Sequence, residues 1–195
     1  MKRDPLNHSR LLDAAAGLAD REGLAAVTVS ALARQVGVKP ASVYSHVKDL
    51  AALLDGIHEL ALGELADAVA GALAGRSGRD ALAGLAQAHR GYAGRHPGRW
   101  AAMQRPAGPG VAGSPAARKI VEYTFAVLRS YGVPDPELVH ATRFVGATIN
   151  GYLALEKAGS FEHRAEHTDL SWQRAVDALD RALQTWTTAH PEGTA

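Results

Sequence analysis

The sequence predicts an all-α protein, and three observations support this prediction. Ala, Leu, Arg and Glu, which favour helices, are abundant throughout the chain. Apolar residues recur at steps of three and four, and no stretch shows the sustained alternation of apolar and polar residues that marks a strand. Glycine and proline lie between the periodic stretches, where they end helices. We therefore expect about nine helices and no sheet.

The composition excludes several classes of protein. The chain has no cysteine, which rules out a thiolate nucleophile, a cysteine-based zinc site and a disulfide scaffold, and fits a reducing cytoplasm. The basic residues Lys2 and Arg3 are followed by polar residues, not by the apolar run of a secretory signal. No stretch approaches the roughly 20 apolar residues of a membrane span. We expect a soluble cytoplasmic protein that does not contact a membrane.

Residues 1–48 are expected to form three helices. The first begins at Pro5 behind Asp4 as N-cap and ends at Gly23. Its buried stripe is Leu11, Ala15, Leu18 and Ala19. The second helix covers residues 29–36 behind Thr28 as N-cap, and the third covers residues 40–47. A three-residue turn, Gly37-Val38-Lys39, separates these two short helices.

This turn has the features of a helix-turn-helix. Ala33 is small enough for close approach, Gly37 allows a left-handed turn, and Val43 lies on the following helix. The remaining core residues are Leu32, Val36, Val38 and Val47. Residues 1–48 carry seven basic and four acidic residues, a net charge of +3, whereas the remainder carries −2. Because no acid lies between Gly23 and Lys48, this surface can approach a polyanion without repulsion.

The outward face of the third helix predicts contact with DNA. Its residues are Lys39, Pro40, Ala41, Ser42, Tyr44, Ser45 and His46, whose polar groups donate to phosphates and base edges. Taken singly, Tyr44 is equally compatible with a partly buried ring that closes the small core. His46 is equally compatible with a histidine placed at a helix C-terminus by the helix dipole. The joint pattern favours binding to double-stranded DNA.

The stretch from Arg10 to Leu54 resembles the TetR family of regulators. The residues that carry the resemblance are V-T-V-x-x-L-A, G-V-x-x-x-x-V-Y-x-H-V and K-D-L-x-x-L-L. The resemblance implies DNA contacts at Thr28, Lys39, Ser42, Tyr44, His46 and Lys48, with the tyrosine and lysines mainly on phosphates. One departure is Lys39, which stands where the family often has a Ser or Thr cap worth about 1 kcal/mol.

Six further helices are expected after Lys48. A long helix over residues 49–74 belongs to both predicted domains, 1–48 and 49–195, and it precedes helices over 80–95, around Trp100 and over 116–131. Residues 106–115, rich in glycine and proline, are expected to form a loop, either a plain connector or the rim of a ligand entrance. The last two helices cover residues 134–159 and 171–190.

These last two helices are predicted to form a homodimer interface. They have apolar residues on more than one face, and we expect an isologous contact through Val145, Ile149, Tyr152, Ala175, Leu179 and Leu183. Residues 143–161, with 96–100, resemble the C-terminal domain of a TetR subgroup that has a Trp-His-Gly motif. This chain has Asn150-Gly151 where that motif has His-Gly, which puts any role of the histidine in doubt.

A hydrophobic small-molecule effector is the third predicted partner, beside DNA and a second copy. The candidate pocket residues are His89, Tyr92, Trp100, Met103, Tyr123, Val127 and Phe144, each of which is also compatible with plain core packing. The TetR resemblance implies a repressor that is released from its operator when the effector tilts the helix over residues 49–74.

Other classes of function find less support. The nine histidines are scattered, and the chain has no phosphate loop, Gly-x-Ser-x-Gly or His-Glu-x-x-His motif, so we expect neither an enzyme nor a cofactor. Glu162-His163-x-x-Glu166-His167 has ligands at metal-binding spacing, but it lies between two helices and is better explained as a solvated linker. A helical ligand-binding or adaptor protein without DNA contacts would explain the C-terminal helices but not the acid-free face.

Overall fold

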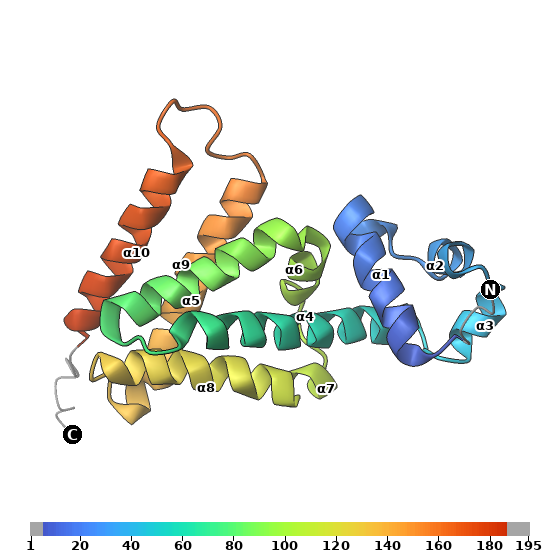
Figure 1. The fold of residues 1–195 in the computed structure, drawn as a ribbon, viewed down its shortest axis with the longest axis horizontal. Coiled ribbons are helices and arrows are strands. Elements are labelled where there is room, and N and C mark those ends of the chain that lie inside the picture. Colours follow the sequence, from blue (N-terminus) through green and yellow to red (C-terminus); the bar gives the residue numbers. More distant parts are fainter. Residues whose placement is uncertain (1–5, 187–195) are drawn as a thin grey trace, which may run out of the picture. The chain divides into compact units, whose positions relative to one another are not determined.

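A computed structural model describes residues 6–186 of the chain, and within that range it confirms the all-α prediction (Figure 1). The described residues form ten α-helices and two short 3-10 helices and include no strand. The elements are α1 (His8–Glu22), η1 (Leu24–Ala26), α2 (Val29–Val36), α3 (Pro40–Tyr44), α4 (Leu50–Leu73), α5 (Gly78–Arg95), α6 (Pro97–Met103), α7 (Pro109–Ala112), α8 (Pro115–Ser130), η2 (Asp135–Glu137), α9 (Leu138–Lys157) and α10 (Thr168–Gln184).

The observed helix boundaries agree best with the predicted ones where a local cap determines them. The predicted bounds of α2 are confirmed, with Thr28 as its N-cap. Helix α1 begins later than predicted, because the side chain of Asn7 accepts a hydrogen bond from Arg10 N at 2.9 Å and caps the helix there. The predicted cap Asp4 and the following Pro5 lie outside the described residues. Helix α3 ends at Tyr44 instead of Val47.

The middle and the end of the chain depart from the predicted elements in detail. The predicted loop 106–115 contains the single-turn helix α7, which starts at Pro109. Helix α9 starts at Leu138 after a 3-10 turn, and α10 starts at Thr168, three residues before the prediction. Proline at the first helical position needs no backbone donor, which suits the starts of α6, α7 and α8.

The chain divides into two compact units. The first unit contains the residues up to Asp67 together with Gly91–Lys119, and the second contains Ala68–Arg90 together with the residues from Ile120 on. The helix-turn-helix therefore lies in one unit with α6, α7 and most of α4. Helices α4, α5 and α8 each contribute residues to both units.

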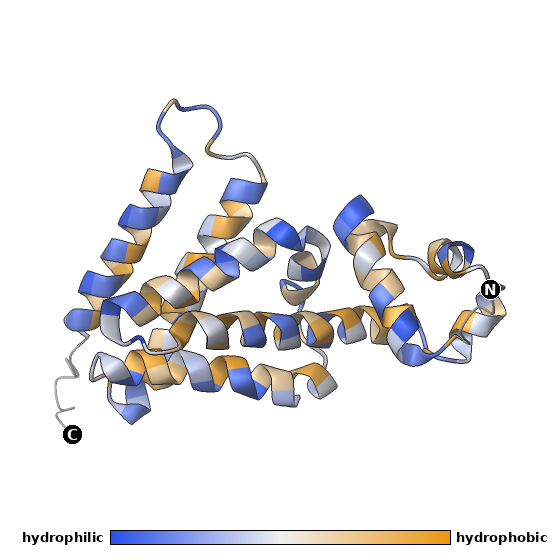
Figure 2. Cartoon of the chain, in the orientation of Figure 1, coloured by the Kyte–Doolittle hydropathy of each residue, from blue (hydrophilic) through white to orange (hydrophobic). Residues whose placement is uncertain are grey.

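Each unit has its own apolar core. In the first unit the predicted stripe of α1 is buried, together with Leu32, Val43, Leu53 and Ile57. In the second unit α9 packs on α10, and the buried residues there include Val145, Ile149, Leu179 and Leu183. Helix α10 shows hydrophobic and hydrophilic bands in turn along its length, as an amphipathic helix does (Figure 2). In the described part of the chain no helix is both long and apolar enough to span a bilayer.

Candidate nucleic-acid interface

The turn between α2 and α3 has the left-handed residue that the sequence predicts at Gly37. Gly37 has φ 74° and ψ 39°, the left-handed conformation that a residue with a side chain adopts only with strain. It ends α2, and Val38 N then donates to the carbonyl of Ala33 at 2.9 Å. Ala33 is buried, so its small side chain permits the close contact between the two helices. At the other end of α2, the Thr28 hydroxyl accepts from Ala31 N at 3.1 Å.

Helix α3 separates its core residues from its outward residues. Val43 and the following Val47 are buried against the rest of the first unit. Tyr44 is 55% exposed and does not belong to the buried core of the first unit. Of the other predicted contact residues, Ser42 and His46 are half-buried. The rest are exposed, namely Thr28, Lys39, Pro40, Ala41, Ser45 and Lys48.

No acid interrupts this outward face, which we call the α3 face and define as Thr28, Lys39–Ser42, Tyr44–His46 and Lys48. The first acid after it is Asp49, whose side chain accepts from Ala52 N at 2.8 Å and so caps α4. Lys39 stands before α3 without a side-chain cap, and Pro40 occupies the first helical position, as the sequence predicted. Thus the α3 face has an uncapped helix start that is flanked by a free ammonium group.

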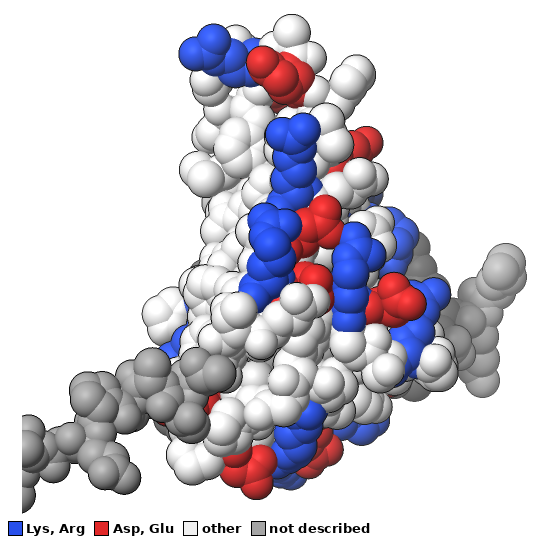
Figure 3. Space-filling model, turned by 90° about the vertical axis from the view of Figure 1, so that its left-hand side faces the viewer, with Lys and Arg blue, Asp and Glu red and all other residues white. Residues whose placement is uncertain are grey.

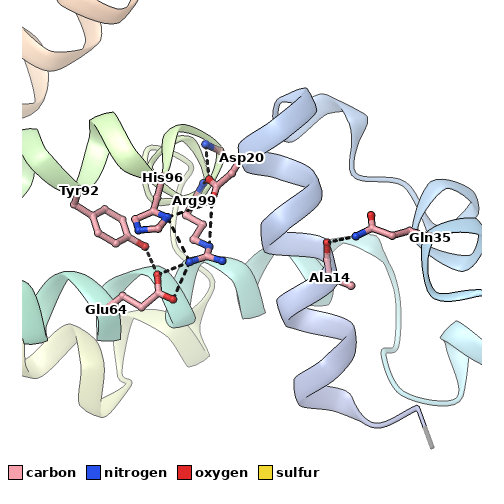
Figure 4. A network of polar contacts seen from close by, with 8 residues as sticks. Ala14, Asp20, Gln35, Glu64, Tyr92, His96 and Arg99 are labelled. Atoms are coloured by element: carbon pink, nitrogen blue, oxygen red, sulfur yellow. Dashed lines mark hydrogen bonds and ion pairs between the residues drawn. The ribbon is translucent and has the colours of Figure 1, made fainter. Parts of the chain in front are cut away.

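A second polar cluster joins α1 to α6, and the sequence did not predict it. It consists of Asp20, Glu64, Tyr92, His96 and Arg99, and we call it the α1–α6 cluster (Figure 4). Asp20 Oδ1 accepts hydrogen bonds from the backbone N of Gly98 and of Arg99, both at 2.9 Å. The carboxylate of α1 therefore caps the N-terminus of α6. A Cβ atom at Gly98 would overlap the backbone of Ala19, so only glycine permits this approach.

The remaining contacts of the α1–α6 cluster extend to α4 and α5. Arg99 Nη1 donates to both oxygens of Glu64, at 3.0 and 3.1 Å, and Arg99 Nε lies 3.3 Å from Asp20 Oδ2. The Tyr92 hydroxyl donates to Glu64 at 2.7 Å, and burial together with this carboxylate raises the pKa of Tyr92. One arginine thus links the carboxylates of two helices. Because the pair Asp20 and Arg99 is 79 residues apart, no local sequence pattern could have indicated it.

The seven predicted effector residues are divided between the two units. Tyr92, Trp100 and Met103 belong to the first unit, and His89, Tyr123, Val127 and Phe144 belong to the second. The Tyr92 hydroxyl is engaged by Glu64, and Val127 is buried. Phe144 is 38% exposed and packs against Trp186, with ring centroids 5.7 Å apart. The effector pocket stays a prediction.

The predicted dimer residues lie largely inside a single chain. Val145, Ile149, Leu179 and Leu183 are each 2% exposed or less, so other residues of the same molecule cover their side chains. Tyr152 is half-buried and donates from its hydroxyl to the carbonyl of Thr168 at 2.8 Å, and Ala175 is also half-buried. The large apolar residues that α9 leaves exposed are Val139, Phe144 and Leu155. These residues form the surface that a partner can reach.

Two other features of the second unit can now be placed. The segment with Glu162, His163, Glu166 and His167 connects α9 to α10, and within the described residues no three potential ligands come together as a metal site. Asn150, which replaces the histidine of the subgroup motif, lies inside α9. Its side chain donates to the carbonyl of Gly146 at 3.0 Å.

Family models match both parts of the chain. The model described as bacterial regulatory proteins, tetR family, matches residues 11–57, which contain α1 to α3. The model described as tetracyclin repressor-like, C-terminal domain, matches residues 82–179, half of the chain. The chain belongs to the TetR family. It is therefore a DNA-binding transcriptional regulator, and the family resemblance of residues 10–54 is confirmed.

Individual transcriptional regulators are similar over most of the chain. An HTH-type transcriptional regulator of Mycobacterium tuberculosis is 31% identical over 156 residues, 79% of this chain and 72% of that protein. The HTH-type transcriptional regulator YobS of Bacillus subtilis is 26% identical over 83% of this chain and 84% of its own. The structure of apo ActR from Streptomyces coelicolor superposes with a TM-score of 0.75 at 20% identity, covering 94% of this chain and 97% of ActR. ActR has also been solved in complex with (S)-DNPA.

Proposed function

We propose that this TetR-family regulator is a dimeric repressor that binds a pseudo-palindromic operator in the cytoplasm and leaves it when a small molecule binds. The observation that carries the proposal is the α3 face, which is exposed, free of carboxylates and held by a buried core on its other side. A helix of this kind enters the major groove, and two copies read half-sites about 34–36 Å apart.

Within the α3 face, the side chains divide into two roles. Lys39, Lys48 and the exposed Tyr44 hydroxyl donate to phosphates and fix the position of the helix on the duplex. Ser42 and His46 lie closer to the core and offer shorter polar groups to base edges. The phosphate contacts supply affinity that decreases with salt, and the base contacts supply selectivity.

The dimer forms through the outer face of α9. Phe144 and Leu155 are 38% and 50% exposed, and between them the exposed Ala147, Gly151 and Ala154 leave room for a second helix to approach. A second copy that presents the same face forms an isologous contact, which gives the operator its two-fold symmetry. The predicted residues Val145, Ile149, Leu179 and Leu183 support this face from behind.

Effector control acts through the α1–α6 cluster. Asp20 ties α1 to the start of α6, and Arg99 ties both to Glu64 of α4. A molecule that displaces α6 or α4 therefore moves α1, on which the helix-turn-helix packs. Such a molecule releases DNA only if it binds the displaced conformation more tightly. The complex of ActR with (S)-DNPA supports a small organic molecule as the effector.

The DNA contact is tested with the DNA upstream of the protein's own gene. We expect sequence-selective binding by fluorescence anisotropy, with log affinity falling linearly against log salt. Lys48→Ala is expected to weaken binding and to lower the salt slope by about 1, because one phosphate contact is lost. Lys119→Ala removes the same charge from an exposed position on α8 and serves as the control. Equal slopes for the two variants, or no selective binding by the folded protein, contradict the proposal.

The dimer interface is tested by sedimentation velocity. Phe144→Glu combined with Leu155→Glu places two charges on the outer face of α9 and is expected to give a monomer, since a buried unpaired charge opposes association. Val121→Glu is the matched control, because Val121 is 42% exposed on α8, outside the proposed interface. If the double variant stays dimeric while Val121→Glu becomes monomeric, the interface lies on α8 and the proposed interface on α9 is wrong.

A further inference from the structure

A hollow of about 520 Å³ lies in the second unit between α5 and α10, and none of the residues assigned above to DNA or to the dimer lines it. Its walls include Arg76, Arg79, Gly84, Arg90, Trp172 and Asp177. On the face of the molecule drawn in Figure 3, basic and acidic side chains are interspersed. The volume is in the range of roughly 300–1,000 Å³ that small-molecule sites occupy.

Small residues on α5 create the hollow. The arginines at 76, 79 and 90 line the hollow, and the residues between them that also line it are Ala83, Gly84 and Gln87, of which two are small. Gly84 has no room for a side chain, because its Cβ atom would lie 2.7 Å from the carbonyl oxygen of Ala72. The same position is 3.3 Å from a guanidinium nitrogen of Arg76. The Arg76 side chain therefore lies across the glycine, over the floor of the hollow.

Arg90 is a structural wall and is not available to a ligand. Its guanidinium group donates twice to Glu156 and lies 2.8 Å from Asp169. It also lies over the indole of Trp172, 5.4 Å from the ring centroid. This arrangement fixes Trp172, which is 5% exposed, at one end of the hollow. The indole of Trp172 therefore forms this end of the hollow, and the charged groups beside it already pair with one another.

The two other arginines can accept an anion. Arg79 pairs with Asp177, but the side chains are 57% and 39% exposed, and a pair so open to solvent exchanges partners at little cost. Arg76 has no carboxylate within 4.0 Å among residues 6–186. A carboxylate placed between Arg76 and Arg79 gains charge-assisted hydrogen bonds without breaking a buried pair. This end of the hollow is therefore cationic.

We propose that the hollow between α5 and α10 is a binding site for a small aromatic carboxylate, with its acid group on Arg76 and Arg79 and its ring against Trp172. Trp172 and Asp177 are five positions apart on α10, which is about 7.5 Å along the helix axis and matches the length of a fused-ring aryl acid. The site does not depend on DNA binding or on the predicted effector residues.

The test uses 2-naphthoate as the probe and isothermal titration calorimetry with the full chain and no DNA. We expect saturable binding of 2-naphthoate that is at least about tenfold tighter than that of the neutral 2-naphthamide, because only the carboxylate forms charge-assisted hydrogen bonds. Arg76→Ala combined with Arg79→Ala should remove this preference. Arg174→Ala is the matched control, because Arg174 is an exposed arginine of α10 that does not line the hollow.

Three results overturn the proposal: no saturable binding of 2-naphthoate, equal affinity for the acid and the amide, or an unchanged preference in the double variant. If the double variant does not fold, Arg76→Gln replaces it, and it should reduce the preference for the acid without lowering the melting temperature. Trp172→Phe in a second series should weaken both probes to a similar degree. Since no DNA is present, failure here leaves the operator experiment untouched.

Discussion

Two groups of ion pairs in this protein have similar chemistry but differ in their exposure to solvent. In the α1–α6 cluster the side chains of Asp20 and Arg99 are 15% and 18% exposed, and the carboxylate also caps a helix. Arg79 and Asp177 of the second unit form a single contact in which both side chains are exposed. A pair at the surface is screened by water and contributes little, whereas breaking a buried pair leaves an unpaired charge. The first group therefore holds helices together, and the second leaves a guanidinium group available to a ligand.

The largest expected effect is the loss of Asp20. In Asp20→Ala the guanidinium of Arg99 loses a partner and α6 loses its cap, so we expect the free energy of unfolding to fall by about 3 kcal/mol. Urea unfolding followed by circular dichroism measures the change. Asp177→Ala removes the carboxylate of the exposed pair and should leave the unfolding midpoint unchanged. If both variants lose a similar free energy of unfolding, the two groups of ion pairs do not differ in their contribution to stability.

Removing single hydroxyl groups sharpens the comparison. The hydroxyl of Tyr92 donates to Glu64 at 2.7 Å in the first unit, and that of Tyr131 donates to Asp180 at 2.6 Å in the second. Asp180 is 7% exposed and also accepts from Gln184, and Glu64 is 34% exposed and also accepts from Arg99. Tyr92→Phe and Tyr131→Phe should each cost about 1 kcal/mol in urea unfolding. If only Tyr92→Phe lowers the free energy of unfolding, the contribution of such a hydrogen bond depends on the unit that contains it and not on burial.

The smallest expected effect depends on pH. Burial lowers the pKa of His89 and of His58 below the ordinary value of about 6.5. Below about pH 6.5 the unfolded chain binds protons that the folded chain does not, so stability falls as pH falls toward the folded pKa values. We expect a loss of up to about 1 kcal/mol between about pH 7 and pH 5. His89→Leu should reduce this pH dependence, and an unchanged slope would show that His89 is accessible to protons in the folded state.

The helix-turn-helix was predictable because its determinants are local. Thr28 caps α2 and Gly37 ends it through interactions within a few residues, and both positions were confirmed. The early end of α3 was not predicted, because Ser45 and His46 have no strong local signal for a helix or for a turn. The late start of α1 has a local origin, because the sequence offers Asn7 as a second possible cap beside Asp4, and Asn7 caps the helix.

The faces of the later helices were harder to predict than their existence. The apolar pattern of α9 indicated two covered sides but not which residues each side uses. Val145 and Ile149 were assigned to a partner, yet they are buried within the single chain. A periodic pattern shows that a side chain needs an apolar neighbour, and the neighbour itself depends on how the helices pack. The hollow lined by the arginines at 76, 79 and 90 was not predicted from the sequence.

The sequence by itself determined the all-α class, the helix-turn-helix and its acid-free outward face, because helix propensity, caps and short turns act between near neighbours. Only the tertiary structure decided that Asp20 of α1 caps α6, that Arg99 bridges it to Glu64, and that α5 and α10 enclose a hollow. These contacts join residues 35 to 98 positions apart. Their formation depends on the packing of whole helices, which no local pattern encodes.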